Sequence, residues 1–242
     1  TRTDSSAASD VYKRQALCGS TKNSAVRRYG SVGITDSYMH DDATRILLAT
    51  IARIAAMHDK SMHPILALFD GHHVRVSVLL KRSKETASDW TKHIGYRIRS
   101  APYHFAKIPE GKYTGPMWTG PISDKDIAGR MTIERAMELC CGSEDDYPED
   151  WNDEDIEHSK REIARTVRHI SESAELLSQD HLLVAIDDLG VCAGVGQIPS
   201  MKSIKKGLEE RGFKMAHCQM PEPMFATDAD WETVLAVTRS AE

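Results

Sequence analysis

Three neighbouring residues, Arg27, Arg28 and Tyr29, combine two guanidinium groups with an aromatic ring. A guanidinium presents a planar fork of donors that matches a phosphate, and a tyrosine ring offers a face on which an unpaired base stacks. These residue types at adjacent positions predict a contact with RNA.

A second group of cations follows an alternating pattern. Apolar residues occupy every second position from Val74 to Leu80, and Arg75 and Lys81 point to the opposite side. This period of two predicts a half-buried strand. We expect Arg75, Lys81 and the adjacent Arg82 to contact RNA; the alternative is that they are solvent-facing strand residues without a ligand.

Trp118 lies between two Gly-Pro breakers in a segment, residues 115–121, that we predict to be irregular. Two roles are open for it. Its ring is either an exposed platform on which a base stacks or a packing anchor in the core.

Other common site chemistries find no support. Cys18, Cys140, Cys141, Cys192 and Cys218 form no C-x-x-C pair, and the histidines show no H-E-x-x-H spacing, so no metal is expected. The glycine-rich segment 190–196 lacks the G-x-G-x-x-G pattern and the Walker lysine of nucleotide loops, and is predicted to be a tight turn between two short helices. No G-x-S-x-G elbow indicates a nucleophilic serine.

Composition points to a globular protein whose charge is uneven. The 242 residues are 40% hydrophobic and 28% charged, and no apolar run is long enough to cross a bilayer. The irregularly spaced cysteines suggest a reducing compartment, so we expect a cytoplasmic protein. Net charge is +8 over residues 1–130 and −13 over residues 131–242. Residues 143–157 hold nine acids and no base, which indicates a solvated acidic loop on a basic body that suits a polyanion.

Hydrophobic periodicity predicts a mixed α/β architecture. Apolar residues at steps of three and four predict helices, and alternation or short apolar runs predict strands and turns. The predicted helices are residues 41–58, 123–140, 155–177, 200–211 and 231–237. The other predicted elements are a turn at 60–64, short apolar segments at 65–69 and 182–189, strands at 74–81, 95–99 and 213–217, and a loop at 221–225. The order of helix, turn, helix, strand and loop after residue 182 resembles a winged-helix unit, a docking module for nucleic acid or protein.

Residues 10–15, D-V-Y-K-R-Q, resemble the translation of a sequencing adapter. They separate two pieces, Thr1 to Ser5 and Ala16 to Ser20, that look like parts of one motif. We therefore expect an insert here, in a fragment of a longer protein whose N-terminal part is missing; the alternative is a natural N-terminal extension.

Taken in order, the segments resemble one family. Thr3-Asp4 with Leu17-Cys18-Gly19 resembles the signature T-D-x-A-x-L-C-G, and residues 27–30 (R-R-Y-G) resemble R-K-Y-G. Residues 115–125 (G-P-M-W-T-G-P-I-S-D-K) are close to G-P-L-W-x-G-P-L-x-D-K. These are signatures of the archaeal-type tRNA (guanine-N2-)-dimethyltransferases, which act on the guanine at tRNA position 26, and the resemblance covers residues 16–242.

The resemblance implies a two-part enzyme. A Rossmann-like domain binds S-adenosylmethionine, and a C-terminal domain peculiar to the family helps to hold tRNA. In this chain, residues 1–99 would be the C-terminal remnant of the methyltransferase domain and residues 100–242 the tRNA-binding α+β domain with the winged-helix-like unit. The segment that follows the family's catalytic strand matches Thr3, Asp4, Leu17, Cys18 and Gly19, which would line the substrate pocket.

Two departures from the family pattern matter. The cofactor loop and the catalytic D-P-F-G motif are absent, so the resemblance implies that this chain alone neither binds S-adenosylmethionine well nor methylates RNA. The two cysteine pairs that many relatives carry ahead of G-P-x-W are also absent from residues 100–113, so their metal is not expected.

The function expected is therefore methyl transfer from S-adenosylmethionine to the exocyclic amine of guanine 26 in tRNA. The alternative is a non-catalytic winged-helix module that binds nucleic acid through Lys202, Lys205 and Lys206. A third possibility is a scaffold that docks a protein through the acidic loop, residues 143–157.

Overall fold

The computed structural model describes residues 15–69, 73–100, 102–142, 147–179 and 181–240. Their helices are α2 (Lys22–Tyr29), α3 (Met39–Ala56), η1 (Ala87–His93), η2 (Ala128–Arg130), α4 (Ile133–Cys140), α5 (Asp153–Leu177), α6 (Ile186–Ala193), α7 (Met201–Glu209) and α8 (Trp231–Ser240). The strands are β1 (Lys60–Phe69), β2 (Val74–Arg82), β3 (Ile94–Ile98), β4 (His104–Ala106), β5 (Tyr113–Trp118), β6 (Leu182–Ala185), β7 (Met215–His217) and β8 (Met224–Thr227). Of the predicted insert, residues 10–14 lie outside the described part.

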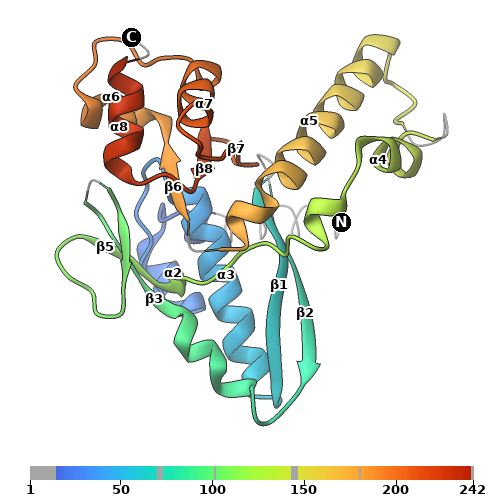
Figure 1. The fold of residues 1–242 in the computed structure, drawn as a ribbon. Coiled ribbons are helices and arrows are strands. Elements are labelled where there is room, and N and C mark those ends of the chain that lie inside the picture. The colour runs from blue at the N-terminus through green and yellow to red at the C-terminus, as the bar shows by residue number, and fades with distance from the viewer. Residues whose placement is uncertain (1–14, 70–72, 101, 143–146, 180, 241–242) are drawn as a thin grey trace.

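The helix α3 packs along a two-stranded antiparallel sheet of β1 and β2 (Figure 1). Leu48 and Ala52 of the helix meet Ala67 of β1 and the alternating Val76 and Val78 of β2 in one core cluster. The helix and the alternating strand were both predicted, and both are confirmed within two residues. Hydrophobic periodicity therefore positions this unit.

The predicted turn at residues 60–64 is wrong, because these residues form the first half of β1. Pro64 pairs with Val78, and the register between the strands shifts directly after it. A proline lacks an N–H and is tolerated in a strand at such an irregularity. The proline thus marks a local distortion of the strand and does not end it.

A second sheet has the order β4-β3-β5 and is antiparallel throughout. The strand β3 was predicted, whereas the prediction of an irregular segment at residues 115–121 is wrong, since β5 runs through Gly115 and Pro116. On the side away from β3, Gly115 exchanges two backbone hydrogen bonds with Val32, at 2.7 and 2.9 Å. A proline fits here because β5 is at the edge of the sheet. This sheet also joins residues on both sides of position 99.

The predicted helix over residues 123–140 is divided in two. The Asp124 side chain accepts hydrogen bonds from the backbone N–H groups of Asp126 and Ile127, which closes a turn before η2. Thr132 then caps α4 by accepting from the Arg135 N–H. Side chains of this type compete with the helical backbone for its hydrogen bonds, which explains the interruption. The long helix α5 follows, beginning after a capping box at Asn152.

The C-terminal residues form a third sheet, in the order β6-β8-β7, with α6, α7 and α8 packed around it. Leu189, Ile204, Leu208, Phe225 and Val234 fill its core. The apolar segment 182–189 is not one element, since it forms β6 and the start of α6.

Two further segments of this unit differ from their predictions. Residues 190–193 of the predicted glycine turn are helical, and α6 ends with Gly194 in the left-handed conformation. The predicted loop 221–225 holds the start of β8. The helix α7 and the strand β7 match their predictions.

These parts meet around the N-terminal end of α3. Figure 1 shows β1, β2 and the rest of α3 extending away from the C-terminal helices, while α5 and α4 project to one side. Residues 143–146 of the predicted acidic loop lie outside the described part. No helix in the described ranges is both long and apolar enough to span a bilayer.

Candidate functional site

Four charged side chains are buried where α3 meets β3 and the C-terminal residues. Asp41, Asp42 and Arg45 lie on α3, and Arg97 lies on β3; we refer to them as the buried ion network. Arg97, Asp41 and Asp42 are at most 1% exposed. Burying a charge is costly unless the charge is paired, so their mutual contacts decide whether this arrangement is stable.

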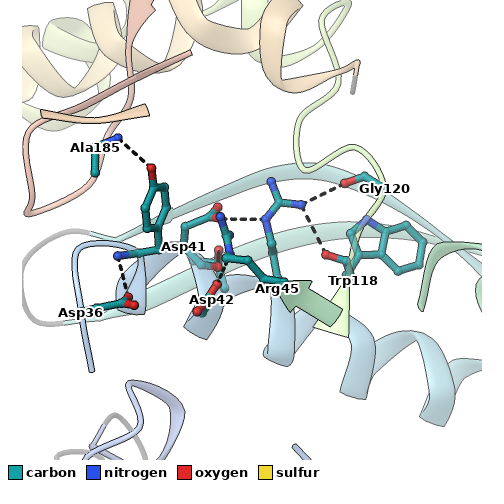
Figure 2. A network of polar contacts seen from close by, with 10 residues as sticks. Asp36, Asp41, Asp42, Arg45, Trp118, Gly120 and Ala185 are labelled. Atoms are coloured by element: carbon teal, nitrogen blue, oxygen red, sulfur yellow. Dashed lines mark hydrogen bonds and ion pairs between the residues drawn. The ribbon is translucent and has the colours of Figure 1, made fainter. Parts of the chain in front are cut away.

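Each of the four side chains has an oppositely charged partner, although one oxygen of each aspartate and one terminal nitrogen of Arg97 have no hydrogen-bond partner among the described residues. Figure 2 shows Asp41, Asp42 and Arg45 of this network. Asp41 accepts from the Arg45 Nε at 2.8 Å and from a terminal nitrogen of Arg97. Asp42 accepts from the Arg97 Nε at 2.5 Å. Two carboxylates and two guanidinium groups thus neutralise one another.

Aromatic rings enclose the Arg97 guanidinium. Its central carbon lies 4.2 Å from the centre of the Tyr103 ring, 4.9 Å from that of Tyr38 and 5.1 Å from that of Phe105. A guanidinium is held on aromatic faces by cation–π attraction, and the attraction is stronger away from water. The rings therefore replace part of the hydration that Arg97 loses.

The surroundings shift the pKa values of the two aspartates in opposite directions. For Asp41, burial favours the neutral acid, but Arg45 and Arg97 together outweigh it and lower the pKa. For Asp42, burial dominates over the one guanidinium that contacts it, and the neighbouring Asp41 adds to the shift, raising the pKa to about 6. Burial also raises the pKa of Tyr103 to about 12.

The same end of α3 is bonded to the C-terminal residues. The hydroxyl of Tyr38 accepts from the Ala185 N–H at 3.2 Å, and the His40 ring lies 2.6 Å from the Glu222 carboxylate. The Arg45 guanidinium donates to the carbonyls of Trp118 and Gly120, each at 3.3 Å (Figure 2). The buried ion network therefore holds three parts of the chain in one arrangement. Its charges are away from solvent, so its role is to position other groups.

The residues predicted to line a substrate pocket are not open to solvent where they are described. Thr3 and Asp4 lie outside the described residues. The side chains of Leu17 and Cys18 pack in a core cluster with Ile46 and Met117, and their place in a substrate pocket stays a prediction. Gly19 lies against Gly33, and a Cβ on Gly19 would come within 2.7 Å of the Gly33 carbonyl carbon.

The residues predicted to bind RNA fall into separate groups. Arg27 and Arg28 are exposed in the last turn of α2, where Tyr29 is half-buried. Arg75, Lys81 and Arg82 are exposed on β2. A strand rises about 3.3 Å per residue, so Arg75 is about 20 Å from Lys81.

Trp118 does not present its ring to solvent. It is 3% exposed, donates from its indole nitrogen to the Pro121 carbonyl at 2.7 Å and packs against His93. Of the two roles left open for it, burial supports the packing anchor, and its contact with RNA stays a prediction.

Sequence reasoning missed the buried ion network. One signal was present, since Asp41 and Arg45 are four residues apart on a predicted helix and such pairs meet on one face. Nothing in the sequence indicated Arg97 as their partner. Within the described ranges, no group of three His, Cys, Asp or Glu side chains is placed to hold a metal ion.

Comparisons with known proteins connect these features to one family. A model of the family "N2,N2-dimethylguanosine tRNA methyltransferase" matches residues 13–239. The tRNA (guanine(26)-N(2))-dimethyltransferase of Methanosphaera stadtmanae is 31% identical over 147 residues, 54% of this chain and 37% of the relative. That of Methanococcus maripaludis is 23% identical over 222 residues, 88% of this chain and 52% of the relative.

A solved structure shares the fold. Trm1 from Pyrococcus horikoshii, determined with S-adenosyl-L-methionine, has a TM-score of 0.72 and 22% identity, covering 93% of this chain and 56% of that protein. The chain thus spans from about a third to about half of the relatives it matches. Because the family match extends over almost all of its residues, the chain belongs to the N2,N2-dimethylguanosine tRNA methyltransferase family.

Proposed function

We propose that the protein containing this chain transfers methyl groups from S-adenosylmethionine to the exocyclic N2 amine of guanine 26 in tRNA. The observation that carries the proposal is the family match over residues 13–239. The curated relatives are named for action on this guanine, and the Pyrococcus horikoshii protein that shares the fold was solved as a complex with this cofactor.

Two hollows near α3 and β5 do not suit S-adenosylmethionine. The enclosed cavity next to Asp41, Ile170 and Cys218 has a volume of about 10 Å³, enough for one water molecule. The larger hollow beside Lys92, His93 and Lys107 is lined by basic groups, which repel a sulfonium cation. We propose that the cofactor is bound by polypeptide outside the described residues, and we derive no reaction step through it.

We propose that α3, β1 and β2 are the C-terminal remnant of a larger Rossmann-like sheet. The outer edge of β1 is partly covered, since Ile65 accepts from the Asp124 N–H at 2.9 Å and Phe69 donates to the Gln219 carbonyl at 3.3 Å. No strand in the described part pairs with the outer edge of β2, where Leu79 and Leu80 are 58% and 42% exposed. Unpaired edges with apolar side chains are the ones that further strands cover.

We propose that residues 100–242 are the tRNA-binding part and that they include a winged-helix unit. The element order β6, α6, α7, β7, β8 with sheet order β6-β8-β7 supports a winged helix. Arg27, Arg28, Tyr29, Arg75, Lys81 and Arg82 are the proposed RNA contacts of residues 1–99. We propose the cytoplasm as the location, because tRNA is the substrate.

The second candidate is a winged-helix module that binds nucleic acid without catalysis. The helix α7 favours it, because Lys202 and Lys206 are exposed on a helix whose Ile204 and Leu208 are buried. The acids Glu172, Glu209 and Glu210 lie within 4.0 Å of Lys205 or Lys206 and offset part of this positive charge.

The proposed activity is tested with the complete coding sequence of the gene. The purified protein is incubated with S-adenosylmethionine and an unmodified tRNA transcript, and the nucleosides are measured by mass spectrometry. We expect N2-methylated guanosine from a transcript with guanine at position 26 and none from the matched transcript with adenine there. Absence of methylated guanosine from both transcripts would contradict the proposal.

A further inference from the structure

An open hollow lies between the end of η1, the strand β4 and the segment after β5. It is lined by Lys92, His93, Phe105, Lys107, Thr119 and Gly120, among others, and has a volume of about 390 Å³. None of the six residues proposed one by one as RNA contacts, Arg27, Arg28, Tyr29, Arg75, Lys81 and Arg82, lines it. We propose that this hollow, which we call the Lys92–Lys107 hollow, binds a phosphodiester group of tRNA; the proposal deepens the proposed function and rests on it for the identity of the RNA.

Lys107 is held in place at the hollow. Its ammonium group donates to the carbonyl of Ile94 at 3.0 Å and to that of Lys92. An ammonium group has three donors, and these two neutral acceptors leave its charge uncompensated. A cation that is fixed before binding loses little side-chain entropy when an anion arrives.

Lys92 supplies a second charge. Its ammonium nitrogen lies 2.5 Å from an Asp89 oxygen, and the side chains are 72% and 47% exposed. Exposed pairs of this kind are weak and are broken at little cost. Lys92 is therefore available to a phosphate that enters the hollow.

His93 reports the positive potential of the hollow. Its half-buried ring lies 4.7 Å from the Trp118 ring, and a Cβ on Gly120 would come within 2.5 Å of its Nδ1. In the part of the chain that the structure describes, neither ring nitrogen has a hydrogen-bond partner. Burial lowers the pKa of His93, and the charge of Lys107 lowers it further; Asp89 acts in the opposite direction, and Lys92 adds the smallest contribution to the lowering. The His93 ring shares the lining of the hollow with two lysines. A ring nitrogen without a partner there can donate a hydrogen bond to an anion, and the anion would also offset the positive charge of the lysines.

The buried ion network shapes the wall of this hollow. Arg45 donates to the carbonyls of Trp118 and Gly120 from the inner side, and its guanidinium carbon lies 4.9 Å from the centre of the Phe105 ring. Two residues of the lining, Phe105 and Gly120, are thus positioned by one buried side chain. The wall formed by these two residues and the ammonium group of Lys107 are therefore positioned before a ligand binds.

The open form of the hollow favours a phosphate within a polymer. Lys92, His93 and Lys107 line the hollow, no acidic residue is among the described residues of its lining, and Asp89 pairs with Lys92. A nucleic-acid backbone carries one negative charge per nucleotide. Two sources of phosphate share this chemistry: a phosphodiester of RNA and a free phosphate or mononucleotide. We commit to RNA, and the experiment distinguishes the two.

The test uses the 242-residue chain and compares Lys92→Gln, Lys107→Gln and the double variant with Lys160→Gln. Lys160 is the matched control, because it is a partly exposed lysine paired with an acid three residues earlier, Glu157, as Lys92 is with Asp89, and it lies away from the hollow on α5. Affinity for a tRNA transcript is measured over a range of salt concentrations. We expect each variant at the hollow to weaken binding several-fold and to reduce the salt slope by about 1, and Lys160→Gln to leave both near wild type.

A second measurement follows the His93 ring by NMR during titration with tRNA, inorganic phosphate and adenosine monophosphate. We expect tRNA to raise the pKa of His93 and to shift its resonances at concentrations near the dissociation constant. If the double variant binds tRNA with the affinity and salt slope of Lys160→Gln, the proposal is overturned. If phosphate or the mononucleotide shifts His93 while tRNA does not, the hollow binds a free phosphate and the RNA proposal is wrong.

These outcomes are separate from those of the methylation assay. If the complete protein methylates guanine 26 but substitution of Lys92 and Lys107 leaves its affinity for tRNA unchanged, only the proposed phosphodiester site in the hollow is contradicted. If the chain binds tRNA through the hollow but the complete protein does not methylate guanine, only the proposed activity is contradicted.

Discussion

The Nε atom of Arg97 lies 2.5 Å from an oxygen of Asp42, and both side chains are buried, although 55 positions separate them in the chain. This pair joins β3 to α3. Because the charges are away from water, the loss of Arg97 leaves Asp42 without an ionic partner or a hydration shell, whereas the loss of Asp42 leaves Arg97 paired with Asp41 alone.

We therefore expect Arg97→Met to destabilise the chain by about 3–5 kcal/mol, the cost of an uncompensated buried charge. Adding Asp42→Asn to that variant removes one of the stranded carboxylates, so the double variant is expected to recover part of the loss. Chemical denaturation of the two variants and of wild type measures this. A change below about 1 kcal/mol for Arg97→Met would show that the network does not hold the fold.

The raised pKa of Asp42 predicts that the stability of the folded chain depends on pH. Its pKa is raised to about 6 in the folded chain, whereas an unfolded aspartate titrates near 3.9. Between these values the folded state binds more protons than the unfolded state, so the stability that Asp42 contributes falls as pH rises from about 4 to about 6. The full difference is about 3 kcal/mol, from about two units of pKa at 1.36 kcal/mol each.

Asp42→Asn removes this titration and keeps the other groups, including Asp41, whose lowered pKa keeps it charged over the same range. We expect the free energy of unfolding of wild type, minus that of the variant, to be larger at pH 4 than at pH 7. Urea denaturation at several pH values gives this difference. A difference that is independent of pH would contradict a buried, titrating Asp42.

Gly19 and Gly30 offer a matched pair of substitutions. Both have a positive φ, +81° and +68°, but a Cβ on Gly19 would lie 2.7 Å from the Gly33 and Ile34 backbone, whereas one on Gly30 meets nothing within 4 Å. Gly30→Ala is expected to cost about 1–2 kcal/mol from backbone strain alone. Gly19→Ala adds overpacking and is expected to cost about 2–5 kcal/mol in all. Equal losses in thermal or chemical unfolding would count against this close backbone approach.

Charge neutralisation separates the two proposed modes of tRNA binding. The first variant changes Arg27, Arg28, Arg75 and Lys81 to glutamine, and the second changes Lys202, Lys205 and Lys206. We expect the first to weaken binding more and to reduce the salt slope further, since nearby glutamates already offset charge on α7. Filter binding at several salt concentrations measures both. If the second variant loses more affinity for tRNA than the first, the result would instead favour the winged-helix module.

Several elements follow from local sequence patterns. The alternation from Val74 to Leu80 predicted β2, and the spacing of apolar residues predicted α3 and α7 close to their observed bounds. The period of the hydrophobic pattern and the preferences of the side chains are local properties that extend over a few residues. They therefore predict an element without knowledge of the tertiary structure. The ordered motifs, such as G-P-M-W-T-G-P, likewise indicated the family that the comparison with residues 13–239 establishes.

Other features were decided only by tertiary contacts. Gly115 and Pro116 are local breakers, yet they lie in β5, where β3 pairs with one edge and Val32 bonds to the other. Trp118 was open to two interpretations until the packing of the fold buried it against His93. The partner of Asp41 and Asp42 comes from β3, and no spacing rule reaches that far along the chain. By itself the sequence determined the family, the unevenness of the charge and the longest helices. Which charges are buried and which face solvent depended on how distant segments pack, because burial is a property of neighbours in space.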